Sequence, residues 1–582
     1  MTGQLIDLEA PLVEVAGLRI EFPTEGGAVR AVDGLDFTLG AGGALGLVGE
    51  SGSGKSATAY ALLGLHRGTG ARVSGTVRVA GTDVLGADDA ELRELRGGVA
   101  AMVFQDPLSS LDPYYAIGDQ IAEVYRVHHR GSRAAARARA VEVLDRVGIP
   151  DAARRSRSRP HEFSGGMRQR ALIAMALACE PRLLIADEPT TALDVTVQAQ
   201  ILDLLHELRA ETGMGLLLVT HDLGVVAGSV DDILVMRDGA AVERGPVAEV
   251  LAAPAHDYTR ALLSAVPRID PRPTDGGEPG AAPAPVGAAT PRGRGARTGT
   301  AEEPGAEPLL EAVALRREFG KGRQRLTAVD DVSLQVRAGE TLGIVGESGS
   351  GKTTLGRMLV RLLDPSAGEI RYRGREIGGL GDKALRPLRR DLQMVFQDPV
   401  SSLNPRRSIG ESIADPLRAA GELSDKAVVG RVKELLERVG LDPEWYHRYP
   451  HEFSGGQRQR VGIARALAPE PKLIVCDEPV SALDVTTQAQ VVALLAELRR
   501  DLGLSLVFIA HDLAVVRQVS DRVAVMRGGR IVESGTVDEV YDAPQDPYTK
   551  GLLAAVPVLD PAESAARRAD RRELRSVMVT AP

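Results

Sequence analysis

Short, unbroken apolar runs are the clearest hydrophobic pattern along the chain. Residues 44–48, 183–186 and 473–476 contain only apolar residues and glycine, and each run is followed at once by glycine or acidic residues. An apolar run of this length is typical of a strand that is buried on both faces in a parallel sheet. The pattern therefore predicts parallel strands whose ends carry polar clusters.

The same pattern occurs twice, because the chain is a duplication. Three strings return in the same order: residues 48–56 at 345–353, residues 103–107 at 395–399, and residues 161–166 at 451–456. Small loop deletions account for the changing offset between the copies. We therefore expect two domains of one fold in tandem.

The segment between the copies, residues 268–308, is dominated by Pro, Gly and Ala and has no helical or strand periodicity. It is predicted to be a flexible linker, and about 41 residues of coil reach roughly 35 Å, enough for the two domains to pair face to face. The predicted domains are residues 11–267 and 309–560, followed by a charged tail at 561–582.

Composition limits the class of protein. Of the 582 residues 44% are hydrophobic and 26% are charged, which is a globular balance, and the net charge of -9 gives no broad basic footprint for nucleic acid. The two cysteines, Cys179 and Cys476, point to a reducing compartment without a disulfide framework. The N-terminus lacks a signal-peptide pattern, and apolar runs such as residues 171–179 stop far short of the roughly 18–20 residues of a membrane span. We therefore expect membrane association only through partners.

The glycine-rich loops after residues 48 and 345 carry the most specific chemistry. Each runs from an apolar strand into a helix-prone segment. Glycines let backbone N–H groups curl around an anion, the helix N-terminus adds a positive dipole, and the lysine reaches the terminal phosphates. The predicted ATP-binding residues are Gly49, Ser51, Gly52, Gly54, Lys55, Ser56 and Ala57 in the first half and Gly346, Ser348, Gly349, Gly351, Lys352, Thr353 and Thr354 in the second.

An acidic pair ends the apolar strand in each half, Asp187-Glu188 and Asp477-Glu478. Such a pair alone is more often an ordinary strand end. After a phosphate loop, the Asp can support magnesium through its water shell and the Glu can polarise the attacking water. The pair is therefore a predicted magnesium and base site.

The string Phe-Ser-Gly-Gly at residues 163–166 and 453–456 resembles the signature of ABC ATPases, placed as in that family between the phosphate loop and the Asp-Glu strand. The resemblance covers roughly residues 11–267 and 309–560. It implies an α/β fold, with two tandem P-loop NTPase domains that each have a parallel-sheet core, an antiparallel β subdomain and a helical signature subdomain near residues 106–170 or 398–460.

The resemblance also implies roles for single residues. In isolation a Gln or His is more often a satisfied polar residue, but these stand in the family's slots. The implied catalytic residues are Glu188, Glu478, His221, His511, Gln105 and Gln397; the magnesium ligands are Ser56, Thr353, Gln105, Gln397, Asp187 and Asp477; and the further ATP contacts are Ser164, Gly165, Gly166, Ser454, Gly455 and Gly456, with Phe22 and Phe319 stacking on adenine.

Family members of this kind pair head to tail, so the resemblance implies one ATP between Lys55 and Ser454 and another between Lys352 and Ser164.

The edge-strand position of Phe22 and Phe319 is also compatible with an ordinary core role. All catalytic slots are filled in both halves, so both sites are expected to hydrolyse ATP with Mg²⁺.

A narrower resemblance is to the peptide and nickel importer branch. It is carried by Val-Phe-Gln-Asp-Pro-Leu-Ser-Ser-Leu-Asp-Pro at residues 103–113, by Val-Phe-Gln-Asp-Pro-Val-Ser-Ser-Leu-Asn-Pro at 395–405, and by the similar domain ends at 257–267 and 547–557. It implies two membrane permease subunits, an extracytoplasmic substrate-binding protein and a place on the cytoplasmic face of the membrane. Many relatives carry a cysteine cluster near the C-terminus, which is missing here, so no iron–sulfur centre is expected. The alternative function is a tandem ABC ATPase acting on ribosomes or nucleic acid, which the acidic chain and the Pro/Gly/Ala-rich linker disfavour.

Overall fold

The computed structural model describes residues 11–24, 27–191, 193–269, 307–320, 325–398, 402–481 and 483–580. The predicted linker lies almost entirely outside the described residues. The chain divides into two compact units. The first comprises Met1–Val266, Asp484–Thr486 and Ala554–Pro582, and the second comprises Pro267–Leu483 and Thr487–Leu553.

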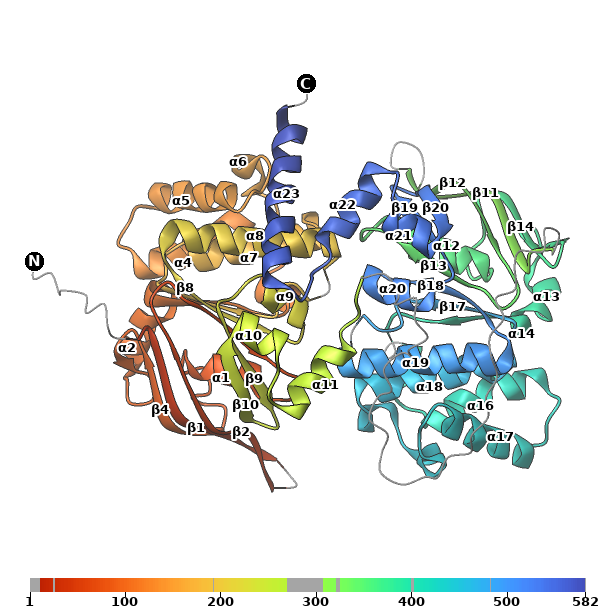
Figure 1. Ribbon diagram of the computed structural model, residues 1–582, viewed down its shortest axis with the longest axis horizontal. Coiled ribbons are helices and arrows are strands. Elements are labelled where there is room, and N and C mark those ends of the chain that lie inside the picture. The colour runs from red at the N-terminus through yellow and green to blue at the C-terminus, as the bar shows by residue number, and fades with distance from the viewer. Residues whose placement is uncertain are drawn as a thin grey trace, which may run out of the picture. The chain divides into compact units, whose positions relative to one another are not determined.

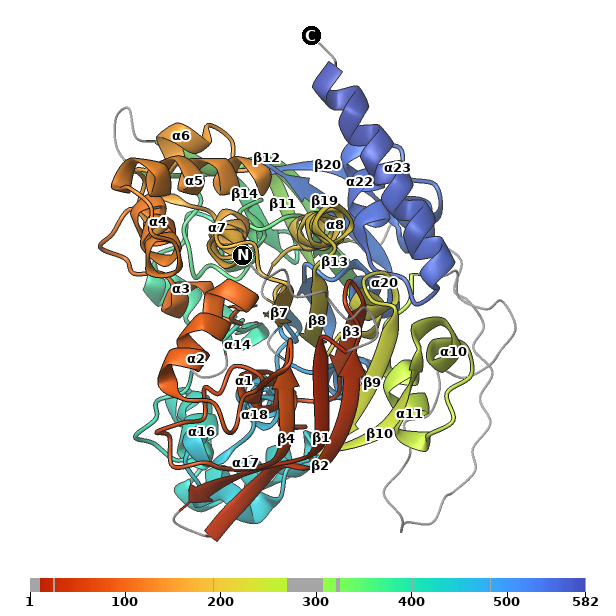
Figure 2. The same ribbon diagram turned by 90° about the vertical axis from the view of Figure 1, so that its left-hand side faces the viewer.

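The first unit is built on a six-stranded sheet with the order β10-β9-β3-β8-β7-β6. Its strands are β3 (Ala44–Val48), β6 (Ala100–Val103), β7 (Leu183–Asp187), β8 (Gly215–Thr220), β9 (Asp232–Arg237) and β10 (Ala240–Pro246). All neighbours pair in parallel except β10, which is antiparallel to β9. Every residue of β3, β7 and β8 is buried, and β3 and β7 are the strands expected here from the apolar runs. Figure 2 shows β7, β8, β3 and β9 side by side.

A four-stranded antiparallel sheet, β2-β1-β4-β5, completes the β structure described in this unit. Its strands are β1 (Val13–Thr24), β2 (Gly27–Leu39), β4 (Arg72–Val79) and β5 (Thr82–Asp83). In β2 the last residues alternate between buried and exposed, as in a strand with one face on a core. The predicted antiparallel subdomain is thereby confirmed.

The helices of the first unit fall into two groups. Between β6 and β7 lie α3 (Pro107–Ser110), α4 (Ile117–His128), α5 (Arg133–Arg146), α6 (Ala152–Arg155), a 3₁₀ turn (Pro160–Glu162) and α7 (Gly165–Leu177), which form the predicted helical signature region. The others are α1 (Lys55–Ala61), α2 (Asp89–Glu94), a π turn (Leu95–Val99), α8 (Val195–Thr212), α9 (Leu223–Ala227), α10 (Val247–Ala252), α11 (Asp257–Ala265) and the C-terminal α23 (Pro561–Thr580).

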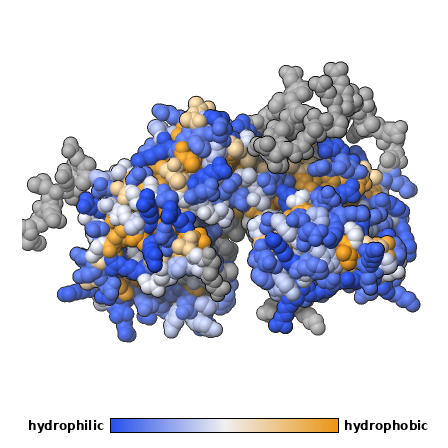
Figure 3. Space-filling view, turned by 90° about the horizontal axis from the view of Figure 1, so that it is seen from below, coloured by the Kyte–Doolittle hydropathy of each residue, from blue (hydrophilic) through white to orange (hydrophobic). Residues whose placement is uncertain are grey.

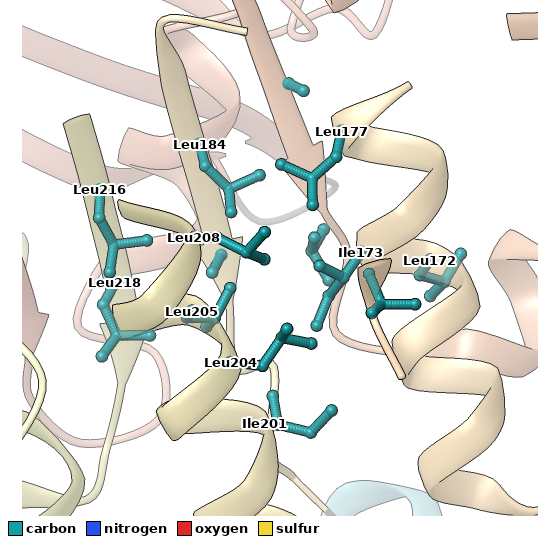
Figure 4. Packing of buried hydrophobic residues seen from close by; sticks show 14 of the residues in the cluster. Leu172, Ile173, Leu177, Leu184, Ile201, Leu204, Leu205, Leu208, Leu216 and Leu218 are labelled. Carbon is teal, nitrogen blue, oxygen red and sulfur yellow. The ribbon is translucent and has the colours of Figure 1, made fainter. Parts of the chain in front are cut away.

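Two of these helices close one face of the central sheet (Figure 4). In α8, buried leucine and isoleucine residues recur at the spacing of one helical face. They pack with residues of α7 against the side chains of β7 and β8. The labelled members are Leu172, Ile173, Leu177, Leu184, Ile201, Leu204, Leu205, Leu208, Leu216 and Leu218.

The second unit repeats this architecture, with sheet orders β16-β17-β18-β13-β19-β20 and β12-β11-β14-β15. Its strands are β11 (Leu310–Phe319), β12 (Leu326–Val336), β13 (Thr341–Val345), β14 (Ala367–Tyr372), β15 (Arg375–Glu376), β16 (Leu392–Val395), β17 (Leu473–Asp477), β18 (Ser505–Ile509), β19 (Arg522–Arg527) and β20 (Arg530–Thr536). Its helices are α12 (Lys352–Leu359), α13 (Asp382–Leu385), α14 (Leu388–Asp391), α16 (Ile409–Ala420), α17 (Asp425–Arg438), α18 (Gly455–Leu467), α19 (Val485–Leu502), α20 (Leu513–Val519), α21 (Val537–Asp542) and α22 (Pro547–Ala555), with 3₁₀ turns at Pro443–His447 and Pro450–Glu452.

The segment predicted to be a charged tail is largely the helix α23, drawn in dark blue in Figure 1. It follows the second half in the sequence, yet it belongs to the first unit.

On the face shown in Figure 3, hydrophilic residues predominate and hydrophobic residues form small separate groups. Among the helices that the structure describes, none has the length and apolarity that crossing a membrane requires.

We predict that Leu218→Ala, in the fully buried β8, lowers the free energy of unfolding by about 2–5 kcal/mol, because it removes buried methyl groups and leaves a cavity. Leu326→Ala is the control: its side chain is 66% exposed, and the expected change is under about 0.5 kcal/mol. Urea unfolding followed by circular dichroism measures both. Equal losses for the two variants would contradict the assigned core.

Candidate functional site

The phosphate loop of the first unit joins the end of β3 to the start of α1. Gly54 stands at the N-cap of α1 with a left-handed φ of 97°, and a Cβ there would collide with the main-chain carbonyl of Ala31. The Lys55 side chain is buried, and its ammonium donates to the carbonyl oxygens of Gly49 at 2.7 Å and Glu50 at 2.8 Å. The loop therefore curls around the head of its own lysine.

The second unit repeats the loop almost atom for atom. Gly351 has a φ of 100° at the N-cap of α12. The Lys352 ammonium donates to the carbonyl oxygens of Gly346 at 2.7 Å and Glu347 at 2.9 Å. Both loops thus place a buried cation at a helix N-terminus, an arrangement that suits the phosphates of a nucleotide.

The first acidic residue of each pair ends a buried strand beside this loop. Ser56 Oγ donates to Asp187 Oδ1 at 3.0 Å, and Thr353 Oγ1 donates to Asp477 Oδ1 at 2.9 Å. The other carboxylate oxygen, Oδ2, is buried in both residues and has no hydrogen-bond partner among the described residues. A buried carboxylate oxygen without a donor, next to a hydroxyl, fits the surroundings of a hydrated Mg²⁺ ion.

Burial also changes the protonation of this carboxylate. It raises the pKa of Asp187 to about 6, although the hydrogen bond from Ser56 acts in the opposite direction. Burial raises the pKa of Asp477 as well. Ionising either residue without a cation nearby is therefore costly.

The second acidic residue is held in a strained backbone conformation. Glu188 has a φ of 46° and Glu478 a φ of 45°, values in the left-handed region that residues other than glycine seldom adopt. The Glu188 amide donates to the carbonyl of Val219 at 2.8 Å, and the Glu478 amide to that of Ile509 at 2.9 Å. Pairing with the neighbouring strand thus fixes a turn that aims the glutamate side chain out of the sheet.

Three polar side chains contact the carboxylate of Glu188. Gln105 Nε2 donates to it at 2.8 Å, Thr191 Oγ1 donates at 2.9 Å, and His221 Nδ1 lies 3.1 Å from Oε1. The structure therefore brings the predicted Gln, Glu and His together and adds Thr191, which the sequence analysis missed. A hydroxyl a few residues after an acidic pair gives no signal of its own in the sequence.

The second unit builds the same cluster with one difference. Gln397 Nε2 donates to Glu478 Oε2 at 2.7 Å, and His511 Nδ1 lies 3.5 Å from the same oxygen. Ser481, which follows Glu478 as Thr191 follows Glu188, donates instead to the main-chain carbonyl of Glu478 at 3.2 Å. The Glu478 carboxylate is therefore held differently from that of Glu188.

Each glutamate and histidine shift each other's pKa. Burial raises the pKa of Glu188, but the hydrogen bond and charge of His221 outweigh burial and hold this pKa below its usual value. Burial lowers the pKa of His221, and Glu188 more than offsets that effect, so the pKa of His221 is raised. The pair Glu478 and His511 behaves in the same way. In each pair the two groups therefore favour each other's charged form.

The signature residues lie at a different helix start. Ser164 is the N-cap of α7 and accepts a hydrogen bond from the Met167 amide at 3.3 Å. Ser454 caps α18 in the same way, and there Gln457 Oε1 also accepts from the Ser454 amide at 3.0 Å, which completes a capping box. Methionine has no group for this second bond. Both serines are exposed on their own units, and the glycines that follow, Gly165 and Gly455, are exposed as well.

The two aromatic residues have different neighbours. Phe22, near the end of β1, makes an edge contact with the His66 ring at 5.5 Å between centroids. Phe319, at the end of β11, is 38% exposed, and the Arg317 guanidinium lies 4.9 Å from its ring centroid. Stacking of either ring on adenine remains a prediction.

Comparison with known proteins agrees with the duplication. A family model described as "ABC transporter" matches residues 32–191 and 329–481. Another, described as "Oligopeptide/dipeptide transporter, C-terminal region", matches residues 242–293 and 532–578.

Similar proteins match nearly the whole chain. The glutathione import ATP-binding protein GsiA of Salmonella choleraesuis (strain SC-B67) is 47% identical over 583 residues, which is 96% of this chain and 91% of that protein. GsiA of Escherichia coli O157:H7 is 47% identical over 579 residues with the same coverage. Among solved structures, the dimeric post-hydrolysis state of the ATP-binding cassette MJ0796 bound to ADP and Pi matches with a TM-score of 0.37 and 31% identity, over 39% of this chain and 98% of that chain.

The raised pKa of Asp187 predicts a stability change in the protein without metal or nucleotide. The pKa of Asp187 in the folded protein is about 6, above the ordinary 3.8, so folding favours the protonated carboxyl. This contribution to the free energy of unfolding is complete below pH 3.8 and is lost as the pH rises through 6. We expect Asp187→Asn to raise the free energy of unfolding at pH 7.5 by up to roughly 3 kcal/mol, because one pH unit corresponds to about 1.4 kcal/mol.

Urea unfolding in EDTA at several pH values measures this effect. The gain should shrink as the pH falls toward 4, where the wild-type carboxyl is itself protonated. Asp477→Asn should act in the same direction. An Asp187→Asn protein no more stable than wild type at pH 7.5 would contradict the assigned burial cost.

Proposed function

The chain belongs to the ABC transporter family and is an ATP-binding ATPase, and we propose that its two halves form a pair of ATP sites that power import of a small solute through membrane permeases. One observation carries the proposal. Each unit brings a buried phosphate-loop lysine, a hydroxyl-bound aspartate and a glutamate held by glutamine and histidine into one cluster. A domain that only bound nucleotide would not need the glutamate cluster twice.

The phosphate loop binds ATP first. The ammonium of Lys55 exchanges its loop carbonyl contacts for phosphate oxygens, and the N–H groups at the start of α1 point at the same place. Lys352 does the same in the second half. Since each ammonium is already buried and in place, little side-chain ordering remains to oppose binding.

A magnesium ion fits beside each loop. Ser56, Asp187 and Gln105 would hold it in the first half, and Thr353, Asp477 and Gln397 in the second. Magnesium, when bound, neutralises negative charge on the phosphates. Its charge would also favour the ionised form of the aspartate and so offset the cost of burial.

The glutamate then orients the attacking water. Glu188 is ionised in the resting cluster but is occupied by Gln105 and Thr191. We infer that Gln105 withdraws from Oε2 as a water approaches the carboxylate, while His221 keeps the side chain aimed. The resting cluster therefore couples hydrolysis to a movement of Gln105, and Glu478 with Gln397 repeats the arrangement.

We propose that each ATP is completed by the signature of the opposite half, Ser454 for Lys55 and Ser164 for Lys352. Two observations support this pairing. Each signature serine is exposed on its own unit, and each caps a helix other than the one that follows its own phosphate loop. The glycines Gly166 and Gly456 continue the same helix start, which suits an anion.

The proposed organisation keeps the boundaries predicted from the sequence: two ABC domains at residues 11–267 and 309–560, a linker at 268–308 and a C-terminal segment from 561. Two permease subunits and an extracytoplasmic binding protein would complete the transporter, with this chain on the cytoplasmic face of the membrane. Glutathione and other short peptides are the proposed solutes, because the similar GsiA proteins are named for glutathione import and residues 532–578 match the C-terminal region of peptide transporters.

The import function is tested in proteoliposomes that contain the cognate permeases and the binding protein. ATP turnover should rise when glutathione-loaded binding protein is added and stay unchanged with binding protein alone. Uptake of labelled glutathione should stop when ATP is replaced by a non-hydrolysable analogue. ATP turnover that responds to ribosomes or DNA but not to the permeases would support the alternative function.

We predict that Glu188→Gln and Glu478→Gln each lower single-turnover ATP hydrolysis at their own site by about 10²- to 10⁴-fold, the usual contribution of a positioned general base. Glutamine keeps the size of the side chain and loses the charge. Binding of a fluorescent ATP analogue should persist in both variants, and this is the control for folding. A variant with wild-type turnover would mean that its site is not catalytic.

The composite arrangement makes a crossed prediction. In a chain carrying Lys352→Ala, only the Lys55 site is left to hydrolyse ATP. There Ser454→Arg should abolish the remaining single-turnover hydrolysis, whereas Ser164→Arg should leave it in place. The opposite result, with Ser164→Arg inactivating and Ser454→Arg silent, would show that each half uses its own signature.

A further inference from the structure

The helix α23 packs on the rest of the first unit through an ion pair with a buried carboxylate. Asp203 lies on α8 and its side chain is only 1% exposed. Arg571 of α23 donates to both of its carboxylate oxygens, from Nη2 at 2.7 Å and from Nε at 3.2 Å. Such a bidentate guanidinium–carboxylate contact fixes the orientation of the helix as well as its position.

Neighbouring residues extend the contact. Arg568 donates to the main-chain carbonyl of Gly228, just after α9, and Arg572 pairs with Glu207 of α8 at 3.2 Å. Leu559, shortly before α23, packs against the hydrophobic core of the first unit. The contact therefore combines ion pairs, a hydrogen bond to the main chain and the burial of an apolar side chain.

Two glycines make room for the segment. A Cβ on Gly224 would lie 2.9 Å from the Cβ of Pro557, and a Cβ on Gly228 would collide with Ser564. A side chain at either position would therefore require the C-terminal segment to shift.

The second half lacks this receiving surface. Counted from the matching histidines His221 and His511, the positions of Asp203, Gly224 and Gly228 are taken by Ala493, Ala514 and Gln518. The carboxylate and both glycines are thus missing from the second copy, although the surrounding motifs are repeated.

The sequence that forms the docking helix also differs between the two copies. The shared Ala-Val-Pro ending at residue 557 continues into Pro-Ala-Glu-Ser-Ala-Ala-Arg-Arg at 561–568, which is rich in helix formers. After the matching ending at residue 267, the corresponding string at 271–278 is Pro-Arg-Pro-Thr-Asp-Gly-Gly-Glu, with two prolines and two glycines. Both the helix-forming sequence and the residues that receive it therefore differ between the two copies of this chain.

We propose that α23 is a built-in clasp: the end of the second half docks on α8 and α9 of the first half and keeps the two halves joined when no nucleotide is bound. The chain leaves the second unit between Leu553 and Ala554, so the docked helix is a connection additional to the predicted linker. The inference concerns how the halves are held and needs no particular transported solute.

The test cuts the predicted linker and asks whether the halves stay together. A protease site is inserted within residues 268–308 of the full chain, and the purified protein is cleaved in EDTA without nucleotide. Size-exclusion chromatography should show both fragments in one peak for the wild-type surface. The double variant Gly224→Ala/Gly228→Gln, which installs the residues of the second half, should separate into two peaks.

The matched control is the mirror variant Ala514→Gly/Gln518→Gly, which should remain in one peak. In the docking variant Gly224, which lies within α9, is replaced by a better helix former, and Gly228 follows the helix with a negative φ that other residues can adopt, so separation would not reflect a weaker α9. Uncleaved protein of each variant should keep wild-type ATP affinity at the Lys55 site, which verifies folding.

Hydrogen exchange of the uncleaved wild-type chain gives an independent measurement. Amides of residues 561–572 should be protected in the wild type and should exchange at least tenfold faster in the double variant. Free exchange of this helix in the wild type, separation of the cleaved wild-type halves, or a double variant whose halves stay together would each overturn the clasp. Loss of ATPase activity with the halves still joined would bear on the proposed function and not on the clasp.

Discussion

The hydrogen bond between Ser56 and Asp187 is the contact on which the nucleotide site depends, because it joins the phosphate loop to the adjacent acidic strand. β7 is buried along its whole length, so its last side chain can be ionised only if a donor or a cation meets it. The serine supplies one donor and leaves one oxygen without a partner. The fold thus leaves Oδ2 of Asp187 without a hydrogen-bond donor, and this is also the feature that suits magnesium. Thr353 and Asp477 repeat the contact.

The duplication separates what the chemistry constrains from what it leaves free. The contacts among lysine, hydroxyl, aspartate, glutamate and glutamine are repeated with nearly the same distances, whereas the histidine lies 3.1 Å from the glutamate in the first half and 3.5 Å in the second. These are the positions that we propose hold the phosphates and the water. Differences appear one step further out. Thr191 binds the glutamate side chain where Ser481 binds its main chain, and Met167 leaves α7 without the capping box that Gln457 gives α18. The two sites therefore share their reacting groups and differ in the groups that orient them.

The sequence predicted those parts of the fold that local patterns determine. Continuous apolar runs marked the buried strands β3, β7 and β17, and glycine spacing marked the phosphate loops, because each follows from a few adjacent residues. The left-handed backbone of Glu188 was not predicted, since it depends on pairing with Val219 in another strand. The docking of α23 was not predicted either. The arginines of α23 are typical of a solvated tail. The carboxylate that pairs with Arg571 belongs to Asp203, which lies 368 residues earlier in the chain.

The buried pair of Asp203 and Arg571 also determines what kind of contact the clasp can be. Removing two charges from water costs several kcal/mol per ion, and a well-packed apolar pair of similar volume often stabilises a protein as much or more. The pair therefore contributes little as net stability, but an unpaired Asp203 or Arg571 in that surface is strongly unfavourable. The consequence is selectivity. Asp203 gives Arg571 of α23 one place to pair on α8, and the matching residue of the second half, Ala493, has no carboxylate. A single site for a single helix makes the fused chain asymmetric even where its catalytic groups are alike.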